Sequence, residues 1–442
     1  MAKPRQPGDP PPATRCGTLY GGPDLLRAPA SSSVAYQATG PLLGLRNGLL
    51  IALETIARRV RPQKDSPFQF VHARGRLLDS DMQAELIYAG HGQNQAYCLS
   101  QVFGGDHDLV EEHQGPRLDI ARSLRDRFSS ESFVFAEGLS AQDLGALDVQ
   151  MASMPAWIKQ RVFIQSDWTR QINGLRRSTR QEIARILRKY RFECELSRTP
   201  AAAVHFYEQL YRPFITQRFG QSALVVDRST FLRECRRGLI LRLIRDGSVV
   251  GAALLRRIGR TLAVVWSAAD VELDRDERRG ISDAMDYFSL LYGYIQRCRW
   301  LDLGPSRPDL YDGVLRYKAK WGAVATSGWV PQTSIRWACP QRSAPGRYFL
   351  QRHAYILRLE DALTGVICCP QAMSAEKLRE RINAVDTAGI SHYRVLAGPG
   401  LAPGLAAAYA ESQNGHSTVL ALRDEDNAMN YLAAKPTAQP IS

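Results

Sequence analysis

The segment from Leu301 to Gly322 holds the densest group of side chains suited to group-transfer chemistry. Lys318 and Lys320 lie in its second half, and they are two of only eight lysines among 57 basic residues. Because the chain otherwise uses arginine, the two positions indicate a need for a compact ammonium group. The alternative interpretation is a loop that packs Tyr317 and Trp321 into the core.

A second candidate is the run Arg278, Arg279, Gly280, Ile281 and Ser282, which lies between a predicted strand and a predicted helix. Gly280 allows a tight turn, and Ser282 is a good N-cap residue. A helix N-terminus preceded by two arginines favours a phosphate group, because free N–H groups, the helix dipole and guanidinium groups all attract negative charge. The alternative is an ordinary capped helix that follows a solvated charged loop.

Three predicted antiparallel strands position these residues. They span 239–245, 248–256 and 262–266, and the dipeptides Asp246-Gly247 and Gly259-Arg260 form the turns between them. A helix over 282–297 and a strand over 300–303 follow. This β-β-β-α-β order predicts an α+β fold with a mixed, mostly antiparallel sheet flanked by helices, and not a doubly wound sheet.

A strongly basic helix precedes these strands. Residues 170–191 hold eight basic side chains and one acidic one, a local charge of +7, while Ile183, Ile186, Leu187 and Tyr190 form one buried stripe. Three interpretations stay open for its basic face: a solvated surface, recognition of phosphate on a nucleotide-sugar or acyl carrier, or contact with RNA. A further helix over 205–214 is predicted to be interrupted at Pro213.

The chain is predicted to divide into four consecutive parts. Residues 1–40 form a disordered leader rich in Pro, Gly and Ser, and 41–150 form an N-terminal α/β portion, interpreted as a degenerate companion half. That portion contains a helix over 46–61 and a hairpin over 84–104. Residues 151–340 form the main domain, and 341–442 form a small α/β appendage with strands at 363–369, 393–396 and 418–422.

The composition describes a globular cytoplasmic protein. The 442 residues carry a net charge of +13 and are 45% hydrophobic, which excludes a wholly disordered chain. The eight cysteines are scattered without a C-x-x-C motif, which indicates reduced thiols, and the histidines lack zinc-ligand spacing, so no metal is expected. No apolar stretch approaches the ~18 residues of a membrane span.

These features together resemble the FemAB-type, CelD-like branch of the GNAT acyltransferase superfamily. The three antiparallel strands, the glycine-bearing turn and the pattern Asp302-x-Gly304 carry the resemblance. So does the motif Tyr317-Lys318-x-Lys320-Trp321-Gly322. Weaker matches are Ser178–Arg188, Tyr211-x-Pro213 and Arg218-Phe219-Gly220, and the whole covers roughly residues 157–323.

The resemblance implies transfer of an acyl group to an amine from acyl-CoA, with acetyl-CoA first among donors, or from aminoacyl-tRNA. It implies that residues 278–282 cradle the phosphate of the donor and that Lys318 lies near the transfer centre. The residues expected to contact substrate are Arg180, Arg218, Ser306, Arg307 and Asp312.

Acyl transfer to an amine needs an acceptor for the amine proton and a donor for the tetrahedral oxyanion. Asp270, at the end of the third strand, and Asp302 are the candidate proton acceptors. Tyr317 or Tyr311 is the candidate to return a proton to the leaving thiolate. A turn aspartate and a core tyrosine are the ordinary alternatives for these residues.

Three hypotheses therefore stand. The first is an N-acyltransferase that uses acyl-CoA on an amine, such as that of a cell-envelope or exopolysaccharide precursor. The second is an aminoacyl-tRNA-dependent ligase of the same fold, for which nucleic acid becomes a partner. The third is a catalytically inert module that binds an anionic ligand, because the usual GNAT phosphate loop has additional glycines and this one has only Gly280.

Overall fold

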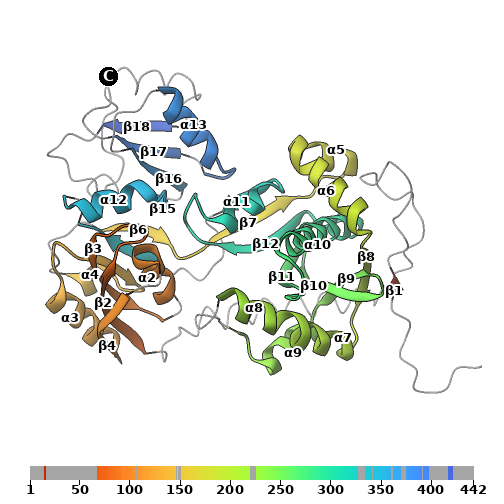
Figure 1. The fold of residues 1–442 in the computed structure, drawn as a ribbon, viewed down its shortest axis with the longest axis horizontal. Coiled ribbons are helices and arrows are strands. Elements are labelled where there is room, and N and C mark those ends of the chain that lie inside the picture. Colours follow the sequence, from red (N-terminus) through yellow and green to blue (C-terminus); the bar gives the residue numbers. More distant parts are fainter. Residues whose placement is uncertain are drawn as a thin grey trace, which may run out of the picture. The chain divides into compact units, whose positions relative to one another are not determined.

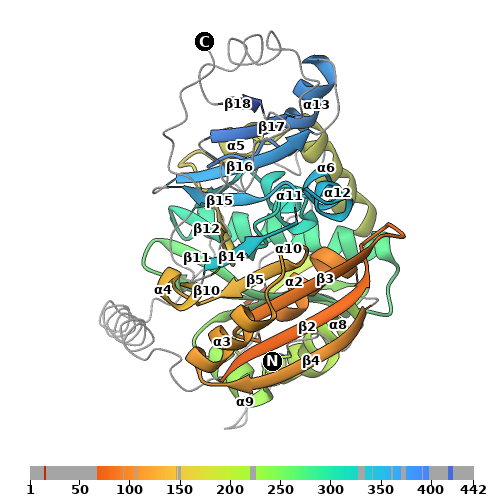
Figure 2. The ribbon, with the colours of Figure 1, turned by 90° about the vertical axis from the view of Figure 1, so that its left-hand side faces the viewer.

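The computed structural model describes residues 14–15, 67–397 and 417–421, apart from short gaps within the long stretch. The gaps are 93, 105–106, 146, 148–150, 220–224, 327–333, 341, 360–361, 370–374 and 391. The predicted helix over 46–61, and the predicted leader except for Thr14–Arg15, lie outside the described residues. Figures 1 and 2 show the described elements from two directions.

Two compact units make up the described chain, and neither is a continuous segment. The first contains Arg161–Gly304 and Lys320–Ala323, and the second contains the described residues of Glu54–Gln160, Pro305–Ala319 and 324–442. These units differ from the predicted consecutive parts 41–150, 151–340 and 341–442. The reason is that the chain passes between units inside strands β7 (Ile158–Phe163), β12 (Trp300–Ser306) and β13 (Ala323–Thr326).

The first unit is built on a sheet whose strand order is β1-β8-β9-β10-β11-β12-β7-β13. Its remaining strands are β1 (Thr14–Arg15), β8 (Glu193–Ser197), β9 (Leu239–Arg245), β10 (Ser248–Ile258) and β11 (Thr261–Ala269). Strands β8 to β11 pair antiparallel, and β11 pairs parallel with β12. The predicted β-β-β-α-β order is confirmed.

Helices cover both faces of this sheet (Figure 1). One face carries α5 (Trp168–Asn173), α6 (Arg177–Tyr190) and α10 (Arg275–Ile295), and the other carries α7 (Pro200–His205), the π-helical turn η2 (Phe206–Tyr211), α8 (Arg212–Phe219) and α9 (Arg228–Arg236). Successive strand residues point to opposite faces. Accordingly, Ala252 and Leu254 pack with Phe206 and Phe231, whereas Gly251 faces Ile281 of α10.

The helix at Pro213 is not interrupted, contrary to the prediction. Pro213 is the second residue of α8, and the π-helical turn η2 ends just before it. A proline inside a helix has no N–H to donate and its ring crowds the preceding turn. The wider π-helical turn relieves this crowding, so the chain remains helical through the proline.

The second unit contains two sheets. The larger has the order β4-β2-β3-β5-β14-β6 and the smaller β15-β16-β17-β18. The larger comprises β2 (Phe68–Arg76), β3 (Gln83–Gly90), β4 (His107–Gly115), β5 (Phe133–Glu137), β6 (Ala152–Pro155) and β14 (Ser334–Ala338). The smaller comprises β15 (Ile356–Leu359), β16 (Ala362–Cys369), β17 (His392–Ala397) and β18 (Ser417–Ala421), which confirms the three C-terminal strands predicted from sequence.

The helices of the second unit are α2 (Gln95–Phe103), α3 (Arg117–Arg127), α4 (Ala141–Leu144), α11 (Gly313–Ala319), α12 (Ala344–Arg352) and α13 (Ala375–Val385). The predicted hairpin over 84–104 is wrong in its second half, because α2 replaces the second strand. Cys98, Leu99, Val102 and Phe103 are buried together at the spacing of one helix face.

The protein is therefore an α+β protein with mixed, mostly antiparallel sheets flanked by helices, as predicted. Among the described residues, no helix combines the length and apolarity that crossing a bilayer requires. The same residues contain no cluster of three or more His, Cys, Asp or Glu side chains that could hold a metal ion.

Candidate functional site

Strands β11 and β12 of the first unit separate partway along their length. Their parallel register runs through Thr261↔Trp300, Leu262↔Leu301 and Ala263↔Asp302 and then ends, although β11 continues to Ala269. A hydrogen bond and an unusual backbone angle, both at Gly304, accompany this separation of the strands. The Gly304 N–H donates to Asp302 Oδ1 at 3.0 Å, and Gly304 has a φ of +78°, a conformation that L-residues rarely adopt. Beyond Ala263, β11 therefore has backbone groups without a β12 partner.

A β-bulge lies in β11 beside this opening. The register with β10 pairs Leu254 with Trp266 and Leu255 with Val264, so Val265 has no opposite residue. A bulge bends the strand and takes one residue out of the hydrogen-bond ladder. The bulge lies in the part of β11 that extends beyond its last pair with β12.

A pocket of about 370 Å³ lies where β11 ends. Four lining residues come from the helical layer and four from the ends of β10 and β11: His205, Gln209, Leu210, Pro213, Val249, Asp270, Val271 and Glu272. The π-helical turn η2 supplies Gln209 and Leu210, and such turns frequently occur at functional sites. The pocket thus joins two parts of the chain that are distant in sequence.

His205 is the ionisable imidazole of this pocket. Burial lowers its pKa, and the nearby guanidinium of Arg242 lowers that pKa further. The imidazole is therefore neutral at pH 7 and makes no hydrogen bond to any described residue. A neutral imidazole has a lone pair that can accept a proton. Sequence reasoning missed His205, because a lone histidine in a predicted helix gives no local signal of function.

Asp270 and Glu272 bring carboxylates to the same pocket. The Asp270 N–H donates to the Val250 carbonyl at 2.9 Å, and the Glu272 N–H donates to Asp270 Oδ1 at 3.0 Å. These bonds fix the chain where it leaves β11. A pocket lined by both carboxylates and an imidazole favours a ligand that carries an amino group, because an ammonium pairs with carboxylates and its proton can pass to His205.

The predicted phosphate turn at 278–282 is wrong, because these residues lie inside α10. Asp274 caps the helix, with its Oδ1 accepting from the Glu277 N–H at 2.8 Å, and Ser282 Oγ instead donates to the Arg278 carbonyl at 3.0 Å. Gly280 is buried against Tyr190, and a Cβ on it would lie 3.0 Å from that ring. Its role is close helix packing, not a turn.

The N-terminus of α10 does not fit the pyrophosphate of coenzyme A. Its own Asp274 carboxylate caps it, and Asp276 and Glu277 lie in its first turn. These negative charges repel a phosphate group. The two arginines are also engaged elsewhere: Arg278 Nη1 donates to the Val271 carbonyl at 2.8 Å, and Arg279 pairs with Glu182 at 3.3 Å. Ile281 is fully buried.

Both rare lysines make buried contacts. Lys318 Nζ donates to the Pro305 carbonyl at 2.7 Å in the second unit, and Lys320 Nζ lies 2.5 Å from Asp283 Oδ1 in the first. These contacts account for the preference for a compact ammonium at both positions. Tyr317, the residue before Lys318, is half-buried on α11. A catalytic role of Lys318, Tyr317 or the buried Asp302 stays a prediction.

The predicted substrate contacts are distributed over both units. In the first unit, Arg180 Nη1 donates to the Asn173 and Leu175 carbonyls, both at 2.8 Å, and the exposed Arg218 lies over the Phe214 ring at 5.9 Å. The other three, Ser306, Arg307 and Asp312, belong to the second unit with Lys318.

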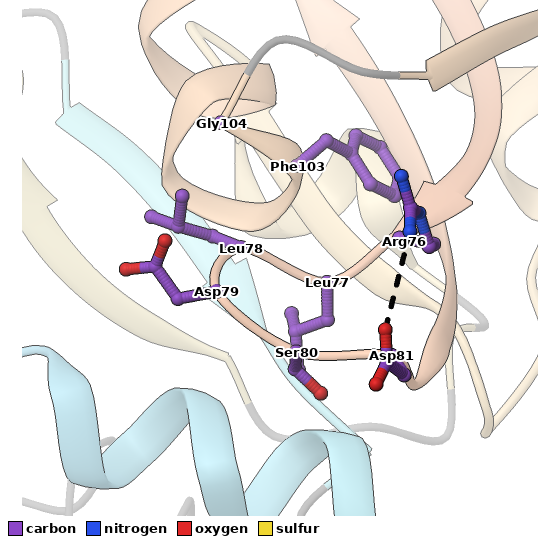
Figure 3. Close-up of a pocket in the computed structure, with 8 residues that line it drawn as sticks. All are labelled: Arg76, Leu77, Leu78, Asp79, Ser80, Asp81, Phe103 and Gly104. Atoms are coloured by element: carbon purple, nitrogen blue, oxygen red, sulfur yellow. Dashed lines mark ion pairs between the residues drawn. The ribbon is translucent and has the colours of Figure 1, made fainter.

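A larger depression, of about 640 Å³, lies in the second unit where the chain turns from β2 to β3 (Figure 3). Its charged side chains are exposed, and Arg76 pairs with Asp81 at 3.9 Å across its rim. It contains no imidazole or thiol in its lining. The pocket at the end of β11 has the better chemistry for proton transfer, so we place the candidate site there.

Known proteins offer distant similarity only. No family model matches the chain, and no curated protein matches it. Among solved structures, it is similar to FemX, with 12% identity over 61% of this chain and 84% of that chain and a TM-score of 0.33. It is also similar to L-PGS from Bacillus licheniformis, with 10% identity, coverages of 62% and 85%, and a TM-score of 0.30. It is similar as well to a GCN5-related N-acetyltransferase from Sphaerobacter thermophilus, with 9% identity over 58% of this chain and 72% of that chain and a TM-score of 0.26. Similarity at this level assigns no activity to the chain.

Proposed function

We propose that the first unit transfers an acyl group from a thioester to an amine. The observation that carries the proposal is the separation of β11 and β12 after Ala263 and Asp302, beside the bulge at Val265. An extended donor that contains amide groups can pair with the open backbone of β11 as an added strand. The unmatched peptide group at the bulge then supplies the N–H donor that a tetrahedral oxyanion requires.

The pocket at the end of β11 supports the acceptor half of the reaction. An amine is mostly protonated at pH 7, so it must lose a proton before its nitrogen attacks the thioester carbonyl. Asp270 and Glu272 attract the ammonium, and neutral His205 accepts its proton directly or through water. The C–N bond then forms, the C–S bond breaks, and the thiolate leaves.

Two donors follow from this proposal. Acyl-CoA, with acetyl-CoA first, is the simplest thioester, but no step is assigned to the N-terminus of α10, because its acidic residues do not fit the phosphates. Aminoacyl-tRNA is the alternative donor; it is an oxygen ester, so the C–O bond breaks and the ribose hydroxyl leaves in place of a thiolate. The basic face of α6 favours it, since Arg177, Arg185, Arg188 and Lys189 are exposed there. An amine-bearing envelope precursor is the proposed acceptor class, on the strength of the sequence resemblance.

The direct test combines donor binding with transfer. Acetyl-CoA, free CoA and charged tRNA are added separately to the full chain, and the melting temperature is measured; a true donor at 100 times its Kd adds about 2.7 kcal/mol of stability. Product formed from the stabilising donor and a panel of amines is then followed by mass spectrometry. His205→Gln and Asp270→Asn are expected to lower the rate by at least about 100-fold.

Asp246→Asn is the matched control for these variants, because Asp246 lies in the exposed β9–β10 turn and is not among the residues that line the pocket. Its transfer rate is expected to equal that of the unaltered chain. If no donor raises the melting temperature and no amine is acylated, the transferase proposal fails and the inert binding module replaces it.

A further inference from the structure

Arg307 of the second unit is held between two aromatic rings. Its Cζ lies 3.6 Å from the centre of the Trp157 ring and 4.1 Å from the centre of the Tyr97 ring. Stacking on both sides fixes the plane of the guanidinium and leaves only its edges for hydrogen bonds. The group is therefore oriented before any ligand arrives.

One edge of this guanidinium is used by a buried polar chain. Arg307 Nη1 donates to Asn94 Oδ1 at 2.6 Å, Asn94 Nδ2 donates to Glu137 Oε1 at 2.7 Å, and the Tyr88 hydroxyl donates to Glu137 Oε2 at 2.6 Å. Glu137 is only 2% exposed, so its negative charge needs compensation inside the unit. The chain of bonds connects Arg307 to Glu137 through Asn94 and fixes which way the Asn94 amide faces.

The other edge of the guanidinium has no partner among the described residues. Arg307 Nε and Nη2 donate to none of the described residues, and neither atom is among the buried polar atoms without a partner, so both face solvent. The Tyr97 hydroxyl, in contrast, is buried and unpaired. Leaving such a group unsatisfied costs about 1–3 kcal/mol. Because Arg307 Cζ lies 4.1 Å from the centre of the Tyr97 ring, this hydroxyl belongs to a ring in direct contact with the guanidinium.

Neighbouring acids limit the charge of an anion at this edge. Burial raises the pKa of Asp312, and the carboxylate of Asp309 raises it further. Both acids are occupied: Asp309 accepts from the Tyr311 N–H at 2.8 Å and contacts the His353 ring at 3.3 Å, and Asp312 accepts from the Leu315 N–H at 2.7 Å. A dianion would meet stronger repulsion from them than a monoanion does.

We propose that the second unit binds a ligand carboxylate at the open edge of Arg307, with Tyr97 as a further donor. The two oxygens of a carboxylate match the paired N–H groups of one guanidinium edge. The phenol then gains the acceptor that it lacks in the structure. This inference does not depend on the transferase proposal, because every group in it belongs to the second unit.

The test follows the Nε–H signal of Arg307 by NMR in the full chain, assigned by its loss in Arg307→Lys. Sodium acetate is the probe, and sodium chloride and inorganic phosphate at equal ionic strength are the comparisons. Acetate is expected to shift this signal saturably, with a Kd on the order of 1–10 mM. Tyr97→Phe, which keeps the ring that stacks on Arg307, is expected to weaken acetate about tenfold.

Arg122→Lys is the matched control, because Arg122 is an exposed arginine of the same unit that pairs only with Asp119 at 3.2 Å among the described residues. Its acetate response is expected to equal that of the unaltered chain. The proposal is overturned if acetate gives no saturable shift, if phosphate or chloride gives the same shift, or if Tyr97→Phe binds acetate with unchanged affinity. Tyr97→Phe keeps the test valid even if Arg307→Lys unfolds.

Discussion

His205 sets the pH dependence expected at the scale of single residues. Burial and Arg242 lower its pKa below its ordinary value of about 6.5, so the neutral form persists to lower pH in the folded chain. If it accepts the amine proton, kcat/KM is expected to fall on the acid side with an apparent pKa below 6.5. Initial rates measured between pH 5 and 8 give this dependence of kcat/KM on pH. In His205→Gln the fall at acid pH is expected to be absent.

The same shift predicts a stability effect of known sign. The unfolded chain binds a proton at higher pH than the folded chain does, so the stability held above about pH 6.5 is lost progressively as the pH falls toward the folded-state pKa. Chemical denaturation at several pH values, with His205→Gln as reference, detects it. If His205→Gln loses the same free energy of unfolding at acid pH as the unaltered chain, another group is responsible for the loss.

Sequence reasoning located several residues but not their partners. It singled out Lys318 and Lys320 from their rarity, and both occupy buried contacts, yet Pro305 and Asp283 could not be named because these contacts form only on folding. Asp270 was named from its place at a strand end. His205 was missed because the pocket exists only where η2 meets the end of β11.

At the scale of elements, β10 and α10 approach closely through a glycine. A Cβ placed on Gly251 would lie 2.5 Å from Ile281 Cγ2, so any larger side chain must push the helix from the sheet. We expect Gly251→Val to lower the free energy of unfolding by about 1–3 kcal/mol, measured in urea.

Gly313→Ala provides the matched comparison for this packing. Gly313 is the first residue of α11, and a Cβ there meets nothing within 4 Å. Its substitution is expected to be neutral or to stabilise by up to about 1 kcal/mol. Equal losses in the two variants would mean that the close approach of β10 and α10 does not constrain position 251.

Element types were predicted better than their boundaries. The alternation and turns of residues 239–269 sufficed for three strands, because local chemistry decides a hairpin. The start of α10 was placed too late, although Asp274 and Glu277 have the spacing of a capping box. The two arginines and Gly280 led instead to the prediction of a turn at 278–282. In the structure, Gly280 is needed for packing against Tyr190. That need depends on tertiary structure.

At the scale of the whole molecule, the first unit is completed by residues that return to it late in the chain. Lys320 and Trp321 belong to it, and Lys320 neutralises Asp283, which is only 1% exposed. Removal of one partner from a buried ion pair costs about 3–5 kcal/mol, a large part of the stability of a domain.

A fragment of residues 161–304 contains most of the first unit but lacks this return. We therefore expect it to show no cooperative thermal transition by near-ultraviolet circular dichroism, whereas the full chain shows one. Asp283→Asn in the same fragment removes the carboxylate that Lys320 neutralises in the full chain and is expected to recover part of the structure. A sharp transition in the unaltered fragment would show that the return is dispensable.

The position of β14 has a consequence for synthesis of the chain. This strand lies between β5 and β6, and its Ile335 pairs with Glu137 of β5. A ribosome that adds 5–20 residues per second needs roughly 10 to 40 s to make the intervening ~200 residues. During that time the apolar β5 has a partner on one edge alone, and an open edge of this kind can recruit other chains. Nascent copies of this protein therefore depend, more than its stability suggests, on factors that shield growing chains until β14 is inserted.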